Sequence, residues 1–187
     1  MKKLGLKEVL VPALSLFVIC LVVSALLAGT NLMTQDTIAL QSRQKEEASR
    51  KVVLSTAETF EETVQGETVY YLGKDASGRE VGYVFTTKAK GYGGDIQVMT
   101  GIDKEGTVTG VVILSQNETP GLGANAVQDA FRDQYKQAAP QNGFSVVKGD
   151  AGEGEISAMT GATISSDAVT QAVNGAVSLF YQIKGGE

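Results

Sequence analysis

The sequence predicts an α+β domain that is joined to a single N-terminal transmembrane helix. Three observations lead to this class. The chain begins with a long uncharged apolar run, β-branched strands then follow in hairpin pairs, and an amphipathic helix closes the chain. With 187 residues, 43% of them hydrophobic and 20% charged, the chain has enough apolar side chains for a folded core.

The N-terminal apolar run is long enough to cross a membrane. Residues 9–28 are apolar except for Pro12, Ser15 and Ser24. About 20 helical residues extend roughly 30 Å, the thickness of the hydrocarbon core of a bilayer. Pro12 is expected in the first turn of this helix, where a missing N–H costs little. A cleaved signal peptide is the alternative, but its apolar region is shorter and ends in a small-x-small site that residues 26–28 do not provide.

The charges around the apolar run predict its orientation. Lys2, Lys3 and Lys7 precede it, and the first charge after it is Asp36. By the positive-inside tendency, residues 1–8 are cytoplasmic and the chain beyond about residue 30 lies on the periplasmic or extracellular face. The expected localisation is therefore the cell (inner) membrane, crossed once, with lipid around residues 9–28. Cys20 falls within this span, where packing is the simplest role for it.

Two segments follow the anchor. Residues 29–67 are expected to form a helical connector, because residues 34–62 are rich in helix formers and contain neither glycine nor proline. Residues 68–187 are expected to form the outer domain.

The outer domain is expected to contain an antiparallel sheet and a C-terminal helix. Strands are predicted at 69–72 and 80–87, and again at 96–102 and 107–114, each pair joined by a short polar turn. A short helix near 125–137 and a strand near 144–148 come next. The last helix, near 165–183, places a row of apolar residues on one face: Val169, Val173, Ala176, Val177 and Phe180.

Composition excludes several kinds of site. Histidine is absent and there is one cysteine, so histidine bases, zinc sites and iron–sulfur sites are not expected. A net charge of −5 gives no basic surplus for nucleic-acid binding. Chemistry must then come from hydroxyls, carboxylates, backbone amides or a cofactor.

Three motifs in connections between elements are candidates for that chemistry. They are Lys90–Asp95, with three glycines around Tyr92, then Glu118–Gly123, and finally Thr160–Asp167 just before the last helix. The first two are also compatible with ordinary turns. In the third, a helix start with small residues can accept a phosphate, and Thr163 can hold or be esterified to one. Alternatively Ser165 or Ser166 is a plain N-cap, with Asp167 in the first turn.

In this order the three motifs resemble a known family. GYGG, then ETPGLG, then TGAT before a C-terminal helix are similar to the covalent FMN-binding domain of RnfG and NqrC, which are subunits of respiratory complexes. The resemblance covers about residues 68–183, and the single N-terminal span agrees with it. Because the chain is short, RnfG is the nearer match. Two positions depart from the family pattern: Gln116 and Asn117 stand where a histidine is frequent, and Ser157 stands where an aspartate is usual.

The resemblance implies a cofactor and its site. A flavin transferase attaches FMN by a phosphoester to the last threonine of the third motif, which is Thr163 here. The first two motifs then line the flavin ring. The implied FMN-binding residues are Tyr92, Gly93, Glu118, Thr119, Pro120, Gly121, Leu122, Gly123, Thr160, Gly161, Ala162, Thr163, Ser165 and Ser166.

The resemblance also implies a function. The chain would be a flavoprotein subunit of an Rnf-type ferredoxin:NAD oxidoreductase complex, relaying electrons to other subunits during redox-driven sodium or proton translocation. It would hold no complete active site of its own. The alternatives are an NqrC-like subunit of a sodium-translocating quinone reductase, an outer-face domain that binds a phosphorylated ligand reversibly, and a purely structural anchor.

Overall fold

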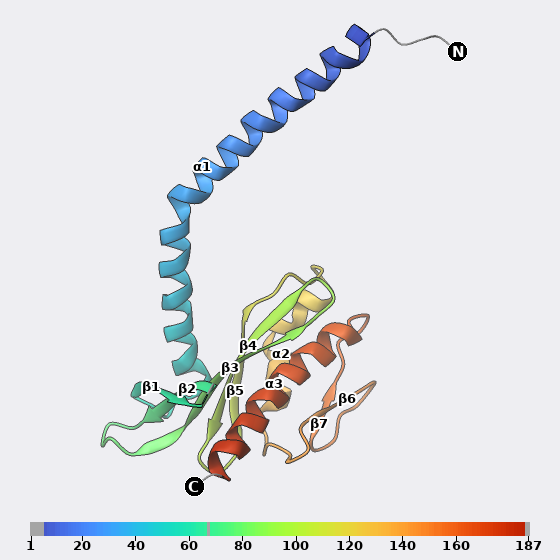
Figure 1. Cartoon of the computed structure of the whole chain (residues 1–187). Helices are drawn as coiled ribbons and strands as arrows, with labels where there is room; N and C mark the ends of the chain where they lie inside the picture. The colour runs from blue at the N-terminus through green and yellow to red at the C-terminus, as the bar shows by residue number, and fades with distance from the viewer. Residues whose placement is uncertain (1–5, 67, 186–187) are drawn as a thin grey trace. The chain divides into compact units, whose positions relative to one another are not determined.

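The computed structural model describes residues 6–66 and 68–185, with side chains from Leu10 onward. Lys2 and Lys3, which carry part of the predicted orientation, lie outside the described residues. Contacts divide the chain into two units, residues 1–44 and 45–187, and helix α1 (Leu6–Val53) runs from the first into the second (Figure 1).

The described residues of the first unit form the N-terminal part of α1. Its apolar stretch is long enough to cross a membrane, and its large apolar side chains from Leu10 to Leu40 are exposed. A single-pass membrane anchor accounts for such a helix. Pro12 lies inside the helix and not in its first turn, because the helix already begins at Leu6. The expectation for Pro12 was therefore wrong by about one turn.

The expected helical connector is corrected by the structure. Helix α1 ends at Val53, and Thr59–Gln65 form strand β1, paired antiparallel with β2 (Thr68–Lys74). Cross-strand contacts of the glutamates outweigh their helix propensity. Lys74 Nζ donates to Glu61 at 2.6 Å, and the Tyr71 hydroxyl donates to Glu62 at 3.0 Å.

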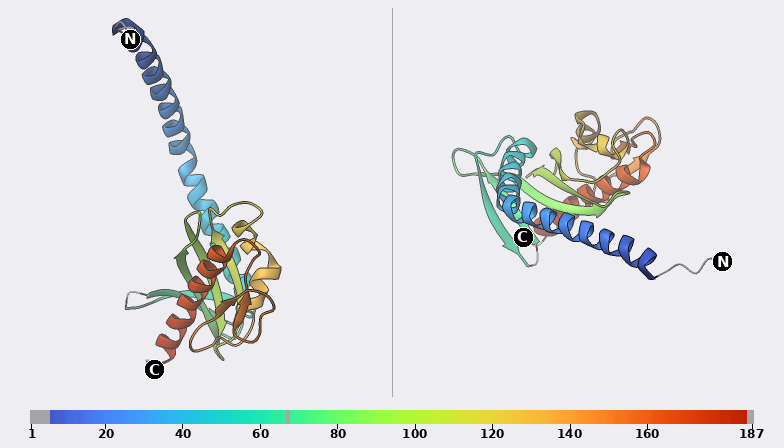
Figure 2. Two further views of the ribbon diagram at one scale, coloured as in Figure 1. Left: turned by 90° about the vertical axis from the view of Figure 1, so that its right-hand side faces the viewer. Right: turned by 90° about the horizontal axis from the view of Figure 1, so that it is seen from above.

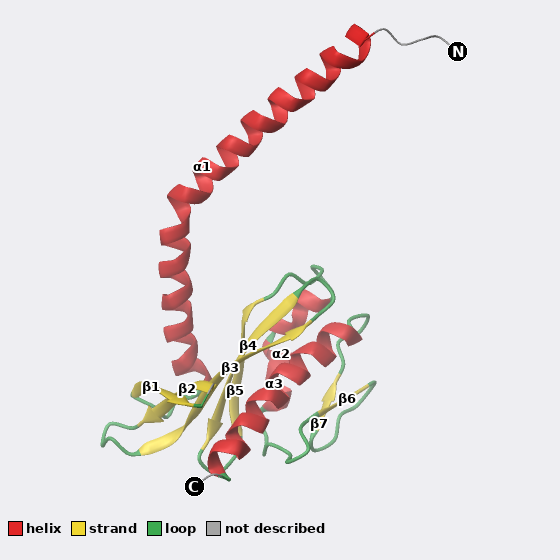
Figure 3. Ribbon diagram, in the orientation of Figure 1, coloured by secondary structure: helices red, strands yellow, loops and turns green. Residues whose placement is uncertain are grey.

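The large sheet confirms the predicted antiparallel hairpins. Strands β1, β2, β3 (Glu80–Lys90), β4 (Asp95–Asp103) and β5 (Val108–Ser115) pair in sequence order (Figure 3). Asp75 fixes the turn between β2 and β3, accepting hydrogen bonds from the hydroxyl and amide of Ser77 and the amide of Arg79. These bonds, the Ser77 hydroxyl first, lower the pKa of the half-buried Asp75 carboxyl.

The main core lies between one face of this sheet and helix α3 (Thr163–Lys184). The predicted apolar row of α3 is buried there, and Phe180 packs edge-on against Tyr83 with ring centroids 5.6 Å apart. Two further views show α3 lying along the sheet (Figure 2).

A second, smaller core covers the opposite face of the sheet. It contains Val53 at the end of α1 and Leu54 just after it, with Ala57, Val84, Met99 and Leu114. The backbone of this segment approaches the strands very closely: a Cβ on Gly101 would lie 2.2 Å from the carbonyl oxygen of Val53. Only glycine leaves room for the chain at this position.

Short elements between β5 and α3 complete the second unit. The helix predicted near 125–137 is divided into η1 (Gly123–Val127), α2 (Asp129–Arg132) and η2 (Asp133–Tyr135). It is interrupted because Gln128 has an extended backbone, with φ −75° and ψ 143°. The predicted strand near 144–148 appears as β6 (Ser145–Val147). It pairs with β7 (Glu155–Ser157), which was not predicted, in a two-stranded parallel sheet.

Candidate functional site

The three motifs meet around one open cavity of about 530 Å³ in the second unit. The loops that follow β3 and β5 approach the start of α3 at one end of the large sheet (Figures 1 and 3). Residues from each motif contribute to the lining: Tyr92, Glu118, Thr119, Leu122, Gly123, Gly161, Ala162, Thr163, Ile164 and Ser165. A cavity of this size is in the range that accepts a small-molecule cofactor.

The start of α3 has no side-chain cap. Its N-cap is Ala162, no side chain bonds to the free amides there, and half-buried Thr163 is the first helical residue. The chain reaches this point through Gly161, whose φ of +74° favours glycine. The first amides of a helix lack partners within it and carry partial positive charge, so this end is suited to an anion.

Ser165 and Ser166, either of which was considered as a plain N-cap, have other partners. The Ser165 hydroxyl donates to Glu118 at 2.5 Å. The Ser166 hydroxyl donates to the Ala162 carbonyl and accepts from the Met159 amide, both at 3.0 Å. The N-cap interpretation is therefore wrong, and Asp167 lies beyond the first turn, which contains no acidic residue.

The second motif forms a tight loop between β5 and η1. The amides of Leu122 and Ala124 both donate to the Thr119 carbonyl, and Gly121 has a φ of +79°. This turn presents Leu122, which is 43% exposed, at the cavity. Gln116, at the position where the family has a histidine, accepts a hydrogen bond from the Glu118 amide.

The first motif forms another wall of the cavity through Tyr92. The Gly91 amide donates to the Gly94 carbonyl at 2.7 Å and closes a turn that carries Tyr92, 74% exposed, at the rim of the cavity. Gly93 is packed so tightly that a Cβ would lie 2.0 Å from the carbonyl oxygen of Asn117. Gly91 and Gly93 thus serve close packing, whereas Gly94, with a φ of +147°, serves the turn.

The structure separates the predicted site residues into two groups. Nine of them line the cavity, and the other five do not: Gly93, Pro120, Gly121, Thr160 and Ser166. Ile164 also lines it and was not predicted, although its place beside Thr163 at the helix start was a usable signal. Ser157 lies in β7, where its hydroxyl donates to the Gly149 carbonyl, and it is not among the lining residues.

Comparison with known proteins agrees with this geometry. A family model described as the RnfG N-terminal region matches residues 1–53, and one described as the FMN-binding domain matches residues 91–178. The G subunit of the Na⁺-translocating ferredoxin:NAD⁺ oxidoreductase complex of Acetobacterium woodii is 39% identical over 91% of this chain and 90% of its own. The chain belongs to the RnfG family.

Other comparisons extend the result. The G subunit of the proton-translocating ferredoxin:NAD⁺ oxidoreductase complex of Clostridium ljungdahlii is 34% identical over 92% of each chain. Among solved structures, NqrC of Shewanella oneidensis aligns with a TM-score of 0.55 over 71% of this chain and 73% of its own, at 21% identity. That likeness shows a shared fold and confirms the predicted class for this RnfG protein.

The lining residues suit FMN by their chemistry. The uncapped start of α3 offers amides to a phosphate group, and Thr163 places a hydroxyl beside them. Tyr92, Leu122 and Ile164 add apolar surface for a planar ring, and the match to the FMN-binding domain names that cofactor.

Proposed function

We propose that this RnfG protein is the membrane-anchored flavoprotein subunit of an Rnf-type ferredoxin:NAD oxidoreductase complex. It relays electrons through FMN carried on Thr163 as part of redox-driven sodium or proton translocation. The relatives from A. woodii and C. ljungdahlii are named for complexes of this kind, one sodium-translocating and one proton-translocating. Its partners are then the other subunits of the complex, a flavin transferase during maturation, and membrane lipid.

One observation supports Thr163 as the attachment point. It is the first residue of an uncapped helix and lines the cavity in which all three motifs meet. Thr160 is exposed and is not a lining residue, so it is the weaker candidate. Attachment forms a bond from the Thr163 hydroxyl oxygen to the phosphorus of a flavin nucleotide and breaks the pyrophosphate bond of the flavin dinucleotide that the transferase supplies, releasing a nucleoside monophosphate and the hydroxyl proton. The resulting phosphodiester lies beside the free amides of α3.

The chain's own residues contribute binding and orientation. When bound, FMN supplies the redox chemistry, accepting and donating electrons. The amides at the start of α3 hold the phosphate end of FMN, and Leu122 and Ile164 cover the apolar surface of its ring. Tyr92 stands exposed at the rim, so the cavity stays open to a partner that exchanges electrons with the ring.

The placement in the membrane follows the same proposal. Residues 9–28 cross the bilayer once with the N-terminus in the cytoplasm, and the FMN-binding domain, 68–187, lies on the periplasmic or extracellular face. The excess of lysine before the apolar run supports this orientation.

A mass measurement tests the attachment. The full chain is produced with and without a flavin transferase, denatured and filtered, and its intact mass and flavin spectrum are recorded. We expect the chain to retain flavin only with the transferase, Thr163→Ala to lose it, and the control Thr160→Ala to retain it.

The other outcomes separate the alternatives. Flavin recovered in the filtrate from wild-type protein would indicate a reversible ligand-binding domain. If Thr160→Ala lost the flavin and Thr163→Ala kept it, the attachment point would be wrong. No flavin on or off the chain, with an active transferase present, would indicate a structural anchor.

A further inference from the structure

The carboxylate of Glu118 is buried without a cationic partner. The residue is 6% exposed, and none of the ion pairs formed by the described residues includes it. Its oxygens are instead satisfied by two hydrogen bonds. Oε1 accepts from the Gly93 amide at 2.9 Å, and Oε2 accepts from the Ser165 hydroxyl at 2.5 Å. A buried carboxylate is tolerated when its oxygens are bonded in this way.

The surrounding glycines leave space for this carboxylate. A Cβ on Gly91 would lie 2.4 Å from Oε1, and a Cβ on Gly123 would lie 2.6 Å from Oε2. On Gly123 it would also lie 2.2 Å from the Ser165 hydroxyl oxygen. Gly91 lies in the first motif and Gly123 in the second. The need for glycine at these two positions is explained by the space that the Glu118 side chain occupies as well as by any ligand.

The two donors come from the two different segments that supply Tyr92 and Thr163 to the cavity walls. Gly93 follows Tyr92 in the first motif, and Ser165 lies in the first turn of α3, two residues after Thr163. The single carboxylate therefore joins the Gly91–Gly94 turn to the helix start. Because a helical turn is stiff, fixing Ser165 also fixes where Thr163 presents its hydroxyl.

We propose that Glu118 is a positioning residue for the flavin site, acting through geometry more than charge. Its two oxygens hold the Gly91–Gly94 turn and the start of α3 in the relation that flavin attachment needs. The part that concerns attachment rests on the function proposed above, whereas the link between the two walls does not.

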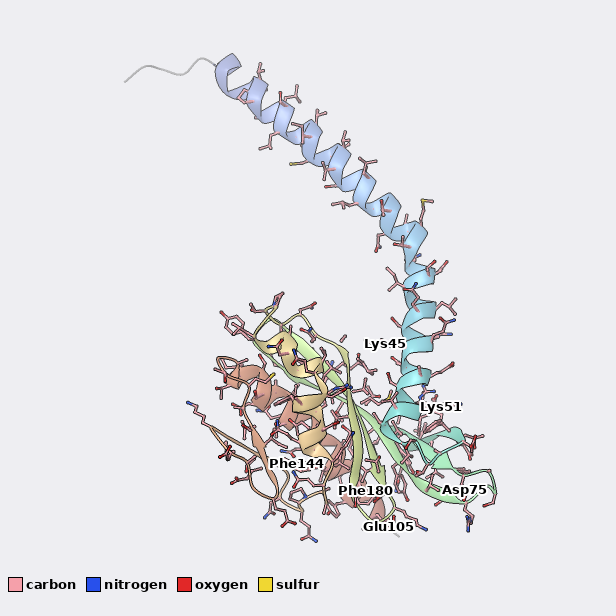
Figure 4. All side chains as sticks on the ribbon, turned by 180° about the vertical axis from the view of Figure 1, so that it is seen from behind. Lys45, Lys51, Asp75, Glu105, Phe144 and Phe180 are labelled. Atoms are coloured by element: carbon pink, nitrogen blue, oxygen red, sulfur yellow. The ribbon has the colours of Figure 1, made fainter. Side chains whose placement is uncertain are left out.

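Two substitutions separate geometry from charge. In Glu118→Gln, the amide oxygen can still accept from Gly93, and the amide NH₂ can donate to Ser165, whose hydroxyl can turn and accept. Glu118→Ala removes both bonds. Glu105→Ala, an exposed site in the turn between β4 and β5 (Figure 4), is the matched control for losing a glutamate.

Hydrogen exchange followed by mass spectrometry on the full chain in detergent measures the link directly, without flavin. In Glu118→Ala we expect exchange in 91–94 and 160–166 to rise about tenfold or more, because a bond to a charged acceptor is lost. Glu118→Gln should stay within about threefold of wild type, Glu105→Ala should be unchanged, and amides in β3 and β4 should not change in any variant.

Coexpression with the transferase gives the second measurement. The fraction of chains that carry flavin should fall in Glu118→Ala and be restored in Glu118→Gln. Unchanged exchange in β3 and β4 separates this local effect from a general loss of stability, which would raise exchange throughout the sheet.

Each contrary result has a definite meaning. Wild-type exchange in Glu118→Ala overturns the link between the walls, and a Glu118→Gln variant that behaves like Glu118→Ala overturns the geometric explanation. If Glu118→Ala unfolds, Ser165→Ala decides, because it removes one bond and must still speed exchange at 160–166. Unmodified wild-type protein beside an active transferase would refute the proposed function and leave the exchange results standing.

Discussion

Tyr135 shows how one polar side chain is accommodated in the main core. Its ring is fully buried between Phe131 and Phe144, with ring centroids 5.8 and 5.5 Å away. Its hydroxyl lies 2.7 Å from Thr170 Oγ1, which itself donates to the Ser166 carbonyl. Tyr135 is thereby the donor in this pair, and the phenol is held in its protonated form.

The stability of the fold should therefore depend on Tyr135 at alkaline pH. Burial raises the pKa of this phenol far above its ordinary value near 10. Above about pH 10 the unfolded chain loses the phenol proton and the folded chain keeps it, so stability falls as pH rises, by up to about 1.4 kcal/mol per pH unit. Below pH 10 this contribution is fully present.

Urea unfolding of the full chain in detergent between pH 8 and 11 tests this expectation. At pH 8, Tyr135→Phe should be less stable than wild type by about 1 kcal/mol, because it loses the bond to Thr170. The gap should narrow above pH 10, since phenylalanine does not titrate. Parallel curves for the two proteins across this range would contradict the argument.

At the scale of elements, helix α3 carries both core packing and the site. Its apolar row is readable from the sequence because the spacing of Val169, Val173 and Val177 is purely local. The sequence left its start open between a phosphate site and a serine N-cap, because the usual capping preference of serine does not reveal that Ser165 is bonded to Glu118, 47 residues away. Long-range partners of this kind leave no local signal.

Strand β1 also shows that local sequence signals do not reveal long-range partners; here they favour a helix where the folded chain has a strand. Glu58, Glu61 and Glu62 favour a continuing helix by local propensity, yet the segment from Thr59 pairs with β2. The pairing depends on contacts such as Glu61 with Lys74, which only the folded chain brings together. The hairpins of β2–β3 and β4–β5 were predictable because their turns and alternation are contained within short windows.

Two glycine substitutions should have opposite effects on these elements. Gly175 lies within α3, where a Cβ would make an ordinary 3.5 Å contact with Thr87. Gly175→Ala should stabilise the protein by about 0.5–1 kcal/mol, because alanine favours the helix. Gly101→Ala should destabilise it, since its Cβ would lie 2.2 Å from the Val53 carbonyl oxygen.

Thermal unfolding of both variants beside wild type measures the contrast. The Gly175→Ala midpoint should rise and the Gly101→Ala midpoint should fall. Equal shifts in one direction would show that backbone entropy, and not the packing of the helix end on the sheet, dominates at both positions.

At the scale of the whole chain, the second unit buries both faces of its sheet. Helix α3 covers one face, and the end of α1 with the following residues covers the other. Lys45 Nζ donates to the Leu114 carbonyl, and the Arg50 guanidinium lies 3.7 Å from the centre of the Tyr71 ring. The last turns of α1 are thus part of the globular unit, although they belong to the same continuous helix as the apolar anchor.

Truncation should reveal this boundary. A chain that begins at Lys45 (Figure 4) retains Val53, Leu54 and Ala57 and should fold without a membrane. A chain that begins at Glu58 leaves Val84, Met99 and Leu114 uncovered. Burial of one valine or leucine side chain contributes about 1.5–3 kcal/mol. The summed loss over the removed and the uncovered side chains should therefore exceed the free energy of unfolding of many small domains.

Circular dichroism and urea unfolding of the two truncated chains decide the point, with Leu54→Ala in the longer one as an intermediate case. That substitution should cost about 2–5 kcal/mol, because it opens a cavity at a fully buried site. Equal unfolding midpoints for the two truncations would show that the end of α1 adds nothing to the sheet. If the longer chain folds and the shorter one aggregates, the end of α1 is a required part of the domain that holds the cavity. Val53 then packs on the same sheet whose loops carry the site, so a change in the position of Val53 is transmitted to that sheet.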